Sequence, residues 1–398
     1  MKSMKSKLTA VAAALLFASP LALAQSGATR PRRVTPSNTV PTPTPAASTA
    51  DAGRPAAAVA AGAPASTARA FSLFQQKQYE AALREAKQVA AADPKNSEAW
   101  KLAGFAELEL QQYEPAVADL QRAQELRRAE GSEDVNIEGA LIRAYVSLER
   151  YEQALPLLVA ATTRAGATPD PRMLYLRGLA ELRTNKAADA ERSFNAAVKA
   201  DPKNAPALLY LGQLAFRRND FTAAINMLNR ATAVDAKLAS AWELLAHSYL
   251  RRAAAAEGPK AEADNLAAVR ASESLVRVRD DEESGALLGQ SLIFANQYAR
   301  AAAALERAAA RPDAKGTTLY LLGFAHSRAK NFPKAIAALE RAAAATPDNA
   351  EVYRELGFAA ESSKQYAKAL AAYERGLQLA PADEYFKESA ERVRPFAK

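Results

Sequence analysis

Cysteine is absent from this chain of 398 residues, and several kinds of chemistry are excluded with it. Without a thiol there is no disulfide, no thiolate metal site, no cysteine nucleophile and no lipid-bearing N-terminal cysteine. Histidine is scarce as well, because only His247 and His326 occur. They do not form a pair at metal-ligand spacing, and neither a G-x-S-x-G motif nor a phosphate loop is present. We therefore expect no enzymatic activity, no metal and no cofactor.

Positive charge is in excess, but not where a nucleic-acid-binding surface would need it. The formal net charge is +8, of which residues 1–24 carry +3 and residues 25–66 carry +3. The remaining residues carry only +2. Nearly balanced charge over the larger part of the chain argues against a phosphate-binding surface there. We expect no nucleic-acid partner.

The first 24 residues have the layout of a signal peptide. A basic start through Lys7 precedes an apolar run over residues 8–17, and Ala22-Leu23-Ala24 is a small–x–small ending. This pattern predicts cleavage after Ala24 and export, with the periplasm as the expected compartment. The alternative is an uncleaved N-terminal anchor, which would be the chain's membrane contact. The apolar run is short for a bilayer-spanning helix.

Residues 25–66 are predicted to be a disordered linker. Seven prolines alternate there with Thr, Ser, Ala and Gly, and no apolar stripe is available to form a core. The segment is interpreted as a tether. A Pro-rich docking ligand is an alternative, and Arg30, Arg32 and Arg33 could contact anionic lipid or glycan.

Residues 316–381 contain two segments that match at a spacing of 34. The matched pairs are Gly323 with Gly357, Phe332 with Tyr366, Ala335 with Ala369, Leu339 with Tyr373, and Pro347 with Pro381. A fixed period of this size indicates a stacked repeat architecture. The pattern resembles the tetratricopeptide repeat, a helix–turn–helix unit of the same length. When Gly316 is counted as position 1 of the repeat, Gly323 is position 8 and Ala335 is position 20. The resemblance implies that these small residues lie where the paired helices cross closely.

The resemblance implies an all-α, right-handed superhelical solenoid of about nine repeats over residues 67–382. The repeats are expected to start near residues 63, 97, 135, 171, 205, 239, 282, 316 and 350. Residues 383–398 are expected to form a capping helix and tail, with a polar outer face that an open array needs for solubility. Repeat six is nine residues too long, within residues 251–264. Two lengthened helices joined by a longer turn explain the excess, and a break between two sub-arrays is the alternative.

In this family the first helix of each unit lines a concave groove, through positions 2, 5, 9, 12 and 13. The candidate partner-binding residues at these positions are Arg143, Tyr175, Arg183, Arg217, His247, Arg251, Tyr320 and Arg328. Arg183, Arg217 and Arg251 recur at the repeat spacing, all at position 13, and would form a ladder. Arginine binds carboxylates, and tyrosine offers apolar area with a polar tip. The alternative is that the arginines only stabilise helix C-termini.

The acidic run Asp280–Glu283 has two interpretations as well. It favours the start of a helix through the helix dipole, or it could bind calcium, although the Gly-punctuated ligand loop is missing. His326 occupies a position that is usually packed, so we interpret it as structural.

These observations predict an exported scaffold that binds a protein or extended peptide in cell-envelope assembly, secretion or pilus biogenesis, and the arginines favour an acidic partner. The family's carboxylate-clamp pattern of Lys and Asn is not reproduced. The alternative function is a structural protein that contacts the cell wall or glycan through the basic Pro-rich linker.

Overall fold

The computed structural model describes residues 65–397 except positions 165, 167 and 313. The expected signal peptide and nearly all of the expected linker lie outside the described residues. The described residues contain nineteen α-helices and one 3₁₀ helix but no strand, so the prediction of an all-α fold is confirmed. The helices are α2 Thr67–Gln75, α3 Tyr79–Ala92, α4 Ser97–Glu109, α5 Tyr113–Ala129, α6 Val135–Ser147, α7 Tyr151–Thr163, α8 Pro171–Arg183, α9 Ala187–Ala200, α10 Ala205–Arg217, α11 Phe221–Val234, α12 Ala239–Ala254, α13 Pro259–Val278, α14 Glu282–Phe294, α15 Tyr298–Ala309, α16 Gly316–Arg328, α17 Phe332–Ala345, α18 Ala350–Ser362, α19 Tyr366–Leu379, α20 Glu384–Val393 and η2 Arg394–Phe396.

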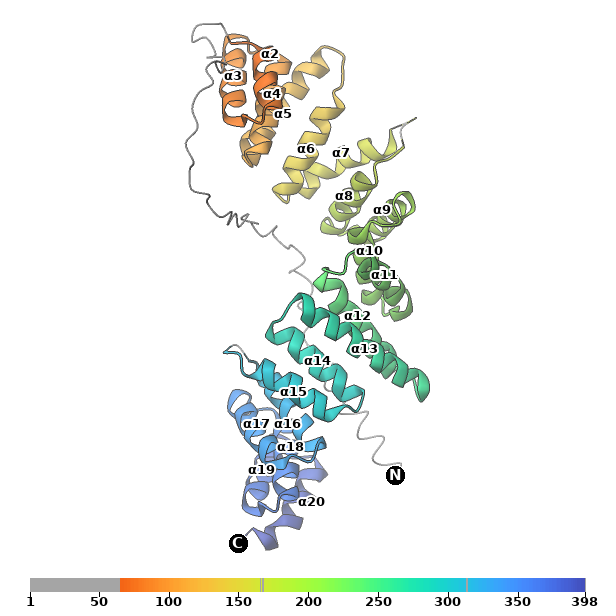
Figure 1. Ribbon diagram of the computed structural model, residues 1–398, viewed down its shortest axis with the longest axis vertical. Coiled ribbons are helices and arrows are strands. Elements are labelled where there is room, and N and C mark those ends of the chain that lie inside the picture. The colour runs from red at the N-terminus through yellow and green to blue at the C-terminus, as the bar shows by residue number, and fades with distance from the viewer. Residues whose placement is uncertain (1–64, 165, 167, 313, 398) are drawn as a thin grey trace, which may run out of the picture. The chain divides into compact units, whose positions relative to one another are not determined.

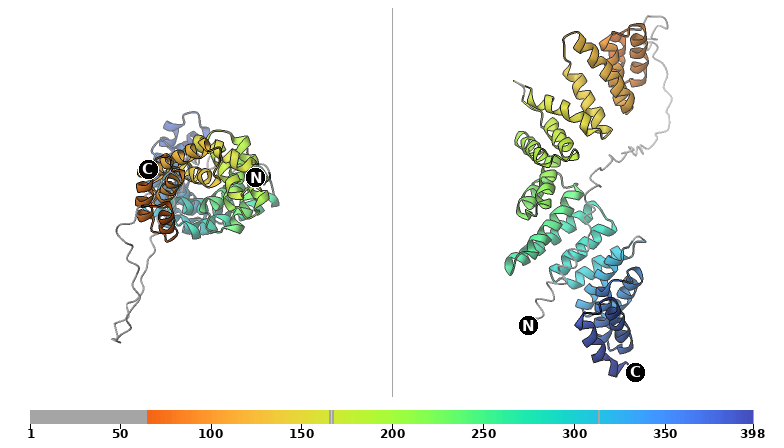
Figure 2. Two further views of the ribbon diagram at one scale, coloured as in Figure 1. Left: turned by 90° about the horizontal axis from the view of Figure 1, so that it is seen from above. Right: turned by 180° about the vertical axis from the view of Figure 1, so that it is seen from behind.

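The chain divides into two compact units between Leu157 and Leu158, and each is described by itself. In the N-terminal unit, helices α2 to α6 pack each against the next. In the C-terminal unit, helices α8 to α20 do the same, and Figure 1 shows them in sequence order. The right-hand view of Figure 2 shows the same order from behind. The core of each unit is therefore spread along the stack instead of forming one centre.

In six of the pairs, the first and second helices approach closely because position 8 is a glycine and has no side chain. A Cβ added at Gly323 would lie 2.8 Å from Leu339 Cδ2 and 3.2 Å from the carbonyl oxygen of Ala335. Leu339 and Ala335 are both fully buried. The expected close crossing at these small residues is confirmed.

The turn between the two helices of a pair contains a residue with positive φ, which is a non-glycine residue in every pair but one. The eight non-glycine residues of this kind are Lys77, Gln111, Glu149, Asn185, Asn219, Asn296, Lys330 and Lys364. From Gln111 on, each follows the start of its pair at the same sequence interval. The repeat that starts at Ala239 has no such residue, and its turn contains Gly258 with φ 63° instead.

The nine extra residues of that repeat lengthen both of its helices. The first helix of this repeat, α12, has 16 residues, whereas the first helices α10 and α14 of the neighbouring repeats have 13 each. Its second helix, α13, has 20 residues. Helix α13 contributes Ala268 to the core around α10–α12 and Val269 to the core around α14–α20. The packing of the C-terminal unit is thus continuous through α13, and the alternative of a break at this insertion is wrong.

Helix α20 closes the C-terminal end of the stack. Phe386, Ser389, Ala390 and Val393 are buried against α19 and its neighbours, while the other face carries exposed charged residues such as Lys387 and Glu391. This polar outer face is what an end repeat needs in water.

Candidate functional site

Three predicted site arginines lie near the C-terminal ends of successive first helices in the C-terminal unit. Arg183 is the last residue of α8, Arg217 is the last residue of α10, and Arg251 lies in the last turn of α12. Arg183 and Arg217 are exposed, and Arg251 is half-buried. Helix α10 packs against α12, so the last two belong to contacting helices. These positions suit partner binding, and they also suit stabilisation of the helix C-termini, because cations in a last turn interact favourably with the helix dipole.

Arg328 has the same register in α16, but its surroundings differ. Its guanidinium lies 3.1 Å from Glu355 of α18 and stacks over the rings of Phe324 and Phe358, at 4.4 and 5.2 Å. Burial raises the pKa of Glu355, and the Arg328 charge opposes that shift. Arg328 therefore ties α16 to α18 and has its charge partner within the fold.

Arg143 lies apart from the other candidates, on α6 of the N-terminal unit. Its guanidinium forms a 2.7 Å ion pair with Glu109 of α4. The pair connects the first helices of two successive repeats. Arg143 is thus exposed but already has an acidic partner.

The two candidate tyrosines contribute to packing. Tyr175 is half-buried, with ring centroids of Phe194 and Tyr210 each 6.1 Å away. Tyr320 is only 8% exposed, and burial raises its pKa above the ordinary value. Tyr320 offers little surface to a partner in this structure. Phe358, which the sequence reasoning passed over, is 37% exposed on α18 and lies one repeat after Phe324.

The two histidines lie on different first helices. His247 is half-buried on α12, and burial together with the nearby Arg251 charge lowers its pKa to about 4. His326 is buried on α16, with Nε2 3.3 Å from Glu306 of α15. Burial lowers the pKa of His326, and the Glu306 carboxylate partly opposes this shift.

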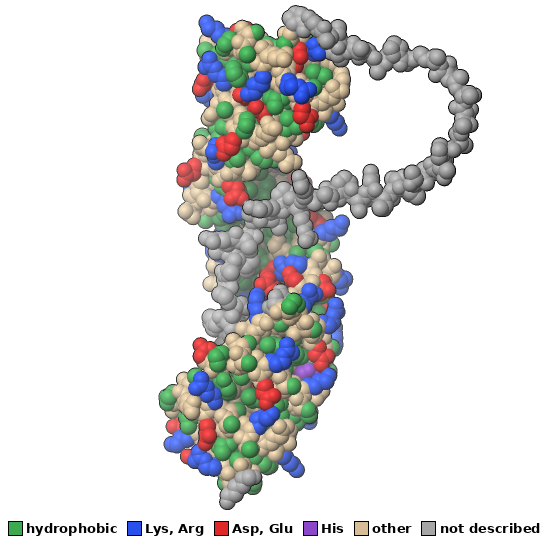
Figure 3. All heavy atoms as spheres, turned by 90° about the vertical axis from the view of Figure 1, so that its left-hand side faces the viewer, with side chains coloured by type: hydrophobic (Ala, Val, Ile, Leu, Met, Phe, Trp, Pro, Cys, Tyr) green, Lys and Arg blue, Asp and Glu red, His purple; other side chains and the backbone are tan. Residues whose placement is uncertain are grey.

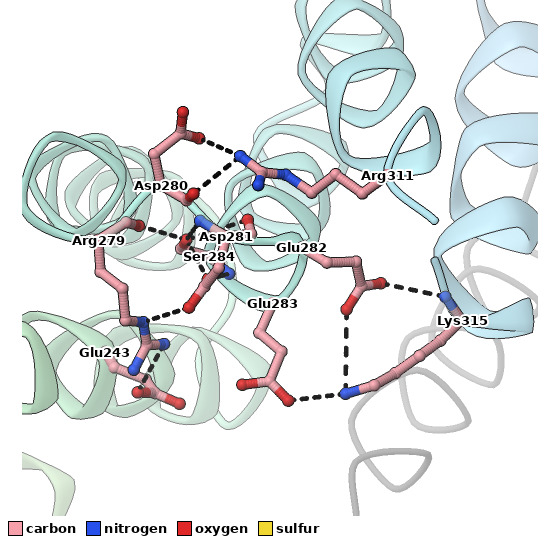
Figure 4. A network of polar contacts seen from close by, with 9 residues as sticks. All are labelled: Glu243, Arg279, Asp280, Asp281, Glu282, Glu283, Ser284, Arg311 and Lys315. Atoms are coloured by element: carbon pink, nitrogen blue, oxygen red, sulfur yellow. Dashed lines mark hydrogen bonds and ion pairs between the residues drawn. The ribbon is translucent and has the colours of Figure 1, made fainter. Parts of the chain in front are cut away.

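The acidic run begins helix α14, and Figure 4 shows how its first two members are held. The Asp281 carboxylate accepts a hydrogen bond from the Ser284 backbone N–H at 2.9 Å. Burial raises the pKa of Asp281, but the Ser284 hydrogen bonds and the Arg279 charge outweigh it and hold that pKa below its usual value. Arg279 also pairs with Glu243 of α12, and Asp280 pairs with Arg311 after α15.

The other two acids of the run reach the next repeat. The Glu283 carboxylate lies 2.7 Å from the Lys315 ammonium, and buried Glu282 accepts hydrogen bonds from the Lys315 backbone N–H and the Thr318 hydroxyl. The run therefore starts a helix, as one interpretation expected, and also links α12, α14, α15 and α16. In the described part of the chain, no group of three or more His, Asp or Glu side chains is placed to hold a metal.

The exposed surface is mixed in charge. On the face of the C-terminal unit seen in Figure 3, Lys and Arg side chains alternate with Asp and Glu. Among the helices that the structure describes, none combines the length and the apolar character needed to cross a bilayer.

The comparisons with known proteins agree with this geometry. One tetratricopeptide repeat model matches residues 67–133, 140–205, 286–350 and 320–384, and a second such model matches residues 181–248. Together they cover more than half of the chain. No curated protein shows a significant match.

Solved structures with a similar fold include YrrB, described as a TPR protein with an unusual peptide-binding site. It is 15% identical, with 50% of this chain and 99% of that chain covered and a TM-score of 0.44. A tetratricopeptide repeat protein from Parabacteroides merdae is 16% identical over 65% of this chain and 96% of its own, with a TM-score of 0.42. MamA from Desulfovibrio magneticus is 23% identical over 44% of this chain and 99% of its own, with a TM-score of 0.38. With every TM-score below 0.5, the assignment rests on the family models and on the repeated helix pairs: the chain belongs to the tetratricopeptide repeat family.

Proposed function

We propose that the chain is a scaffold that binds a protein partner through the first helices α8, α10 and α12. The observation that carries this proposal is the contrast at position 13 within one unit. Arg328 has its partner in Glu355, whereas Arg217 is exposed at the same register. Among the described residues, the Arg217 guanidinium has no ion-pair or hydrogen-bond partner. An exposed guanidinium of this kind suits a carboxylate.

The proposed partner is an extended segment with acidic side chains or a C-terminal carboxylate. Arginine binds carboxylates with two parallel hydrogen bonds, which gives direction as well as attraction. Tyr175 would be a secondary contact in this proposal, because it already packs against Phe194 within the C-terminal unit. His247 would be a neutral contact near the third arginine.

The test is a crosslinking pull-down from cell-envelope fractions with two double variants. Arg183→Glu with Arg217→Glu should abolish recovery of the partner. The matched control is Arg192→Glu with Arg307→Glu, which makes the same charge change on second helices. Both control side chains are 74% exposed. Equal recovery by both double variants would remove the arginines from the site.

We further propose that the protein is exported and works in the cell envelope. The support is the layout of residues 1–24, with its basic start, short apolar run and small–x–small ending. The mass of the protein recovered from the envelope should then correspond to a chain that begins at Gln25. A chain that retains Met1 and stays with the cytoplasmic fraction would contradict export.

A version that begins at Ala63 separates the repeats from the segment before them. If it recovers the same partner as the chain from Gln25, the repeats bind the partner. If only the longer chain recovers it, binding belongs to residues 25–62, and the proposal for the arginines fails.

A further inference from the structure

Two buried carboxylates share one ammonium group at the junction of the first two described helix pairs. Lys87 of α3 lies 3.3 Å from Glu107 of α4 and also forms an ion pair with Asp119 of α5. The side chains of Glu107 and Asp119 are only 3% and 8% exposed. The Lys87 ammonium also stacks over the ring of Trp100, 5.5 Å from its centroid. Three successive helices thus meet at a charged cluster inside the N-terminal unit.

Fully ionised, this cluster would carry two negative charges against one positive charge. Moving a charge out of water is costly unless it is paired and hydrogen-bonded. Oε2 of Glu107 is buried and has no hydrogen-bond partner among the described residues. Both carboxylates lie within ion-pair distance of the same Lys87 nitrogen, so the two acids are close neighbours. A single proton on Glu107 would therefore neutralise the cluster.

We infer that the folded chain holds one proton on Glu107, and that losing this proton loosens the junction between the first and second repeats. With the proton in place the cluster is neutral. Without it the cluster has a net charge of −1, with both carboxylates buried and the Lys87 side chain 42% exposed.

The direction of the pH effect follows from how the proton is held. Burial first, and the Asp119 charge second, raise the pKa of Glu107 from 4.5 to about 7. A carboxyl whose pKa is higher in the folded than in the unfolded chain stabilises the fold fully below pH 4.5. That contribution is lost as the pH rises through about 7. Between pH 6 and pH 8 the local opening constant should rise about tenfold.

Other charged groups on the helices around α4 have partners elsewhere. Arg69 of α2 pairs with Glu85 of α3, and Arg143 of α6 pairs with Glu109. On α4 itself, Lys101 pairs with Glu98 and with Asp134, the residue before α6. Arg127 of α5 also pairs with Glu98. The two histidines of the chain lie on α12 and α16, outside the N-terminal unit.

The experiment uses the full chain with Trp242→Phe, which leaves Trp100 as its one tryptophan. Trp100 emission should change between pH 5.5 and 8.5 with a midpoint near 7, because the ring contacts Lys87. Glu107→Gln removes the titrating carboxyl and should abolish this transition, whereas Asp119→Asn removes the neighbouring negative charge and should lower its midpoint. Glu80→Gln, on the exposed side of α3, should leave it unchanged.

Amide exchange gives a second measurement that does not depend on any variant folding. After correction for intrinsic exchange rates, the opening constants measured at the α3 and α4 amides should be about tenfold larger at pH 8 than at pH 6. The amides of α18 serve as the internal reference. A flat response of both Trp100 emission and α3 exchange would overturn the inference. An unchanged midpoint in Glu107→Gln and Asp119→Asn would overturn it as well.

Discussion

Replacing Gly212 with alanine should destabilise the array, although alanine is the better helix former. The new Cβ would lie 2.6 Å from Cγ and 2.8 Å from Cδ2 of Leu228. Non-bonded carbon atoms prefer about 3.5–4.0 Å, so the overlap is about 1 Å. Leu228 is fully buried in the core that α10, α11 and α12 share.

The size of the effect is the difference between two terms. Overpacking a core position costs about 1–3 kcal/mol. Exchanging Gly for Ala inside a helix gains about 1 kcal/mol. Since the overlap is large and Leu228 is enclosed, we expect a net loss of about 1–2 kcal/mol in the free energy of unfolding.

The assay is urea denaturation followed by circular dichroism, with amide exchange to locate the effect. Exchange should accelerate most in α10 and α11, because repeat units interact mainly with their neighbours. The control is Gly139→Ala in α6, where an added Cβ meets nothing within 4 Å. That variant should gain about 0.5–1 kcal/mol. If Gly212→Ala is as stable as Gly139→Ala, the close crossing is not what selects glycine.

Three smaller changes test other parts of the structure. Arg328→Ala leaves Glu355 buried without its cation and should lower the free energy of unfolding by about 2 kcal/mol. Amide exchange in α18 should become faster. Unchanged amide exchange would show that the ion pair contributes nothing. Lys330→Gly should raise the free energy of unfolding by up to about 1 kcal/mol in urea denaturation, because φ at this residue is 62° and glycine adopts this conformation without strain. Lys334→Gly inside α17 should lower the free energy of unfolding by about as much. The His247 imidazole should titrate near pH 4 by NMR. Because its pKa is lower in the folded chain than in the unfolded chain, the free energy of unfolding should fall as the pH drops from about 6.5 towards 4. A titration midpoint near 6.5 would show that the ring is in water.

The repeat pattern was readable from the sequence because it depends on local rules. Gly323 and Ala335 occupy positions 8 and 20 of one repeat, and both are small for the same close approach of α16 and α17. The first helices begin at Ser97, Val135, Pro171, Ala205, Ala239, Glu282, Gly316 and Ala350, the starts expected from the sequence. The two lengthened helices of repeat six were predicted for the same reason, since extra residues between two fixed helix pairs must extend the helices or the turn.

The candidate site was less predictable, because equal register does not mean equal surroundings. Arg217 and Arg328 both occupy position 13, yet only Arg328 meets a buried glutamate and two phenylalanine rings. Tyr175 and Tyr320 both occupy position 5, yet Tyr320 is buried and Tyr175 is half-buried. These differences depend on side chains from neighbouring repeats, which a single-repeat pattern does not contain.

The sequence by itself determined the helix-pair fold, the register of the repeats, the family and the place of the insertion. Each of these follows from helical periodicity, small residues at crossings and turn-forming residues at fixed intervals. Only the tertiary structure decided which charged groups are buried together. Lys87, Glu107 and Asp119 come from three helices, and the acidic run Asp280–Glu283 reaches cations on either side of it. Burial and pairing are set by how the helices pack, so the ion pairs and pKa shifts of this protein could be identified only from the tertiary structure.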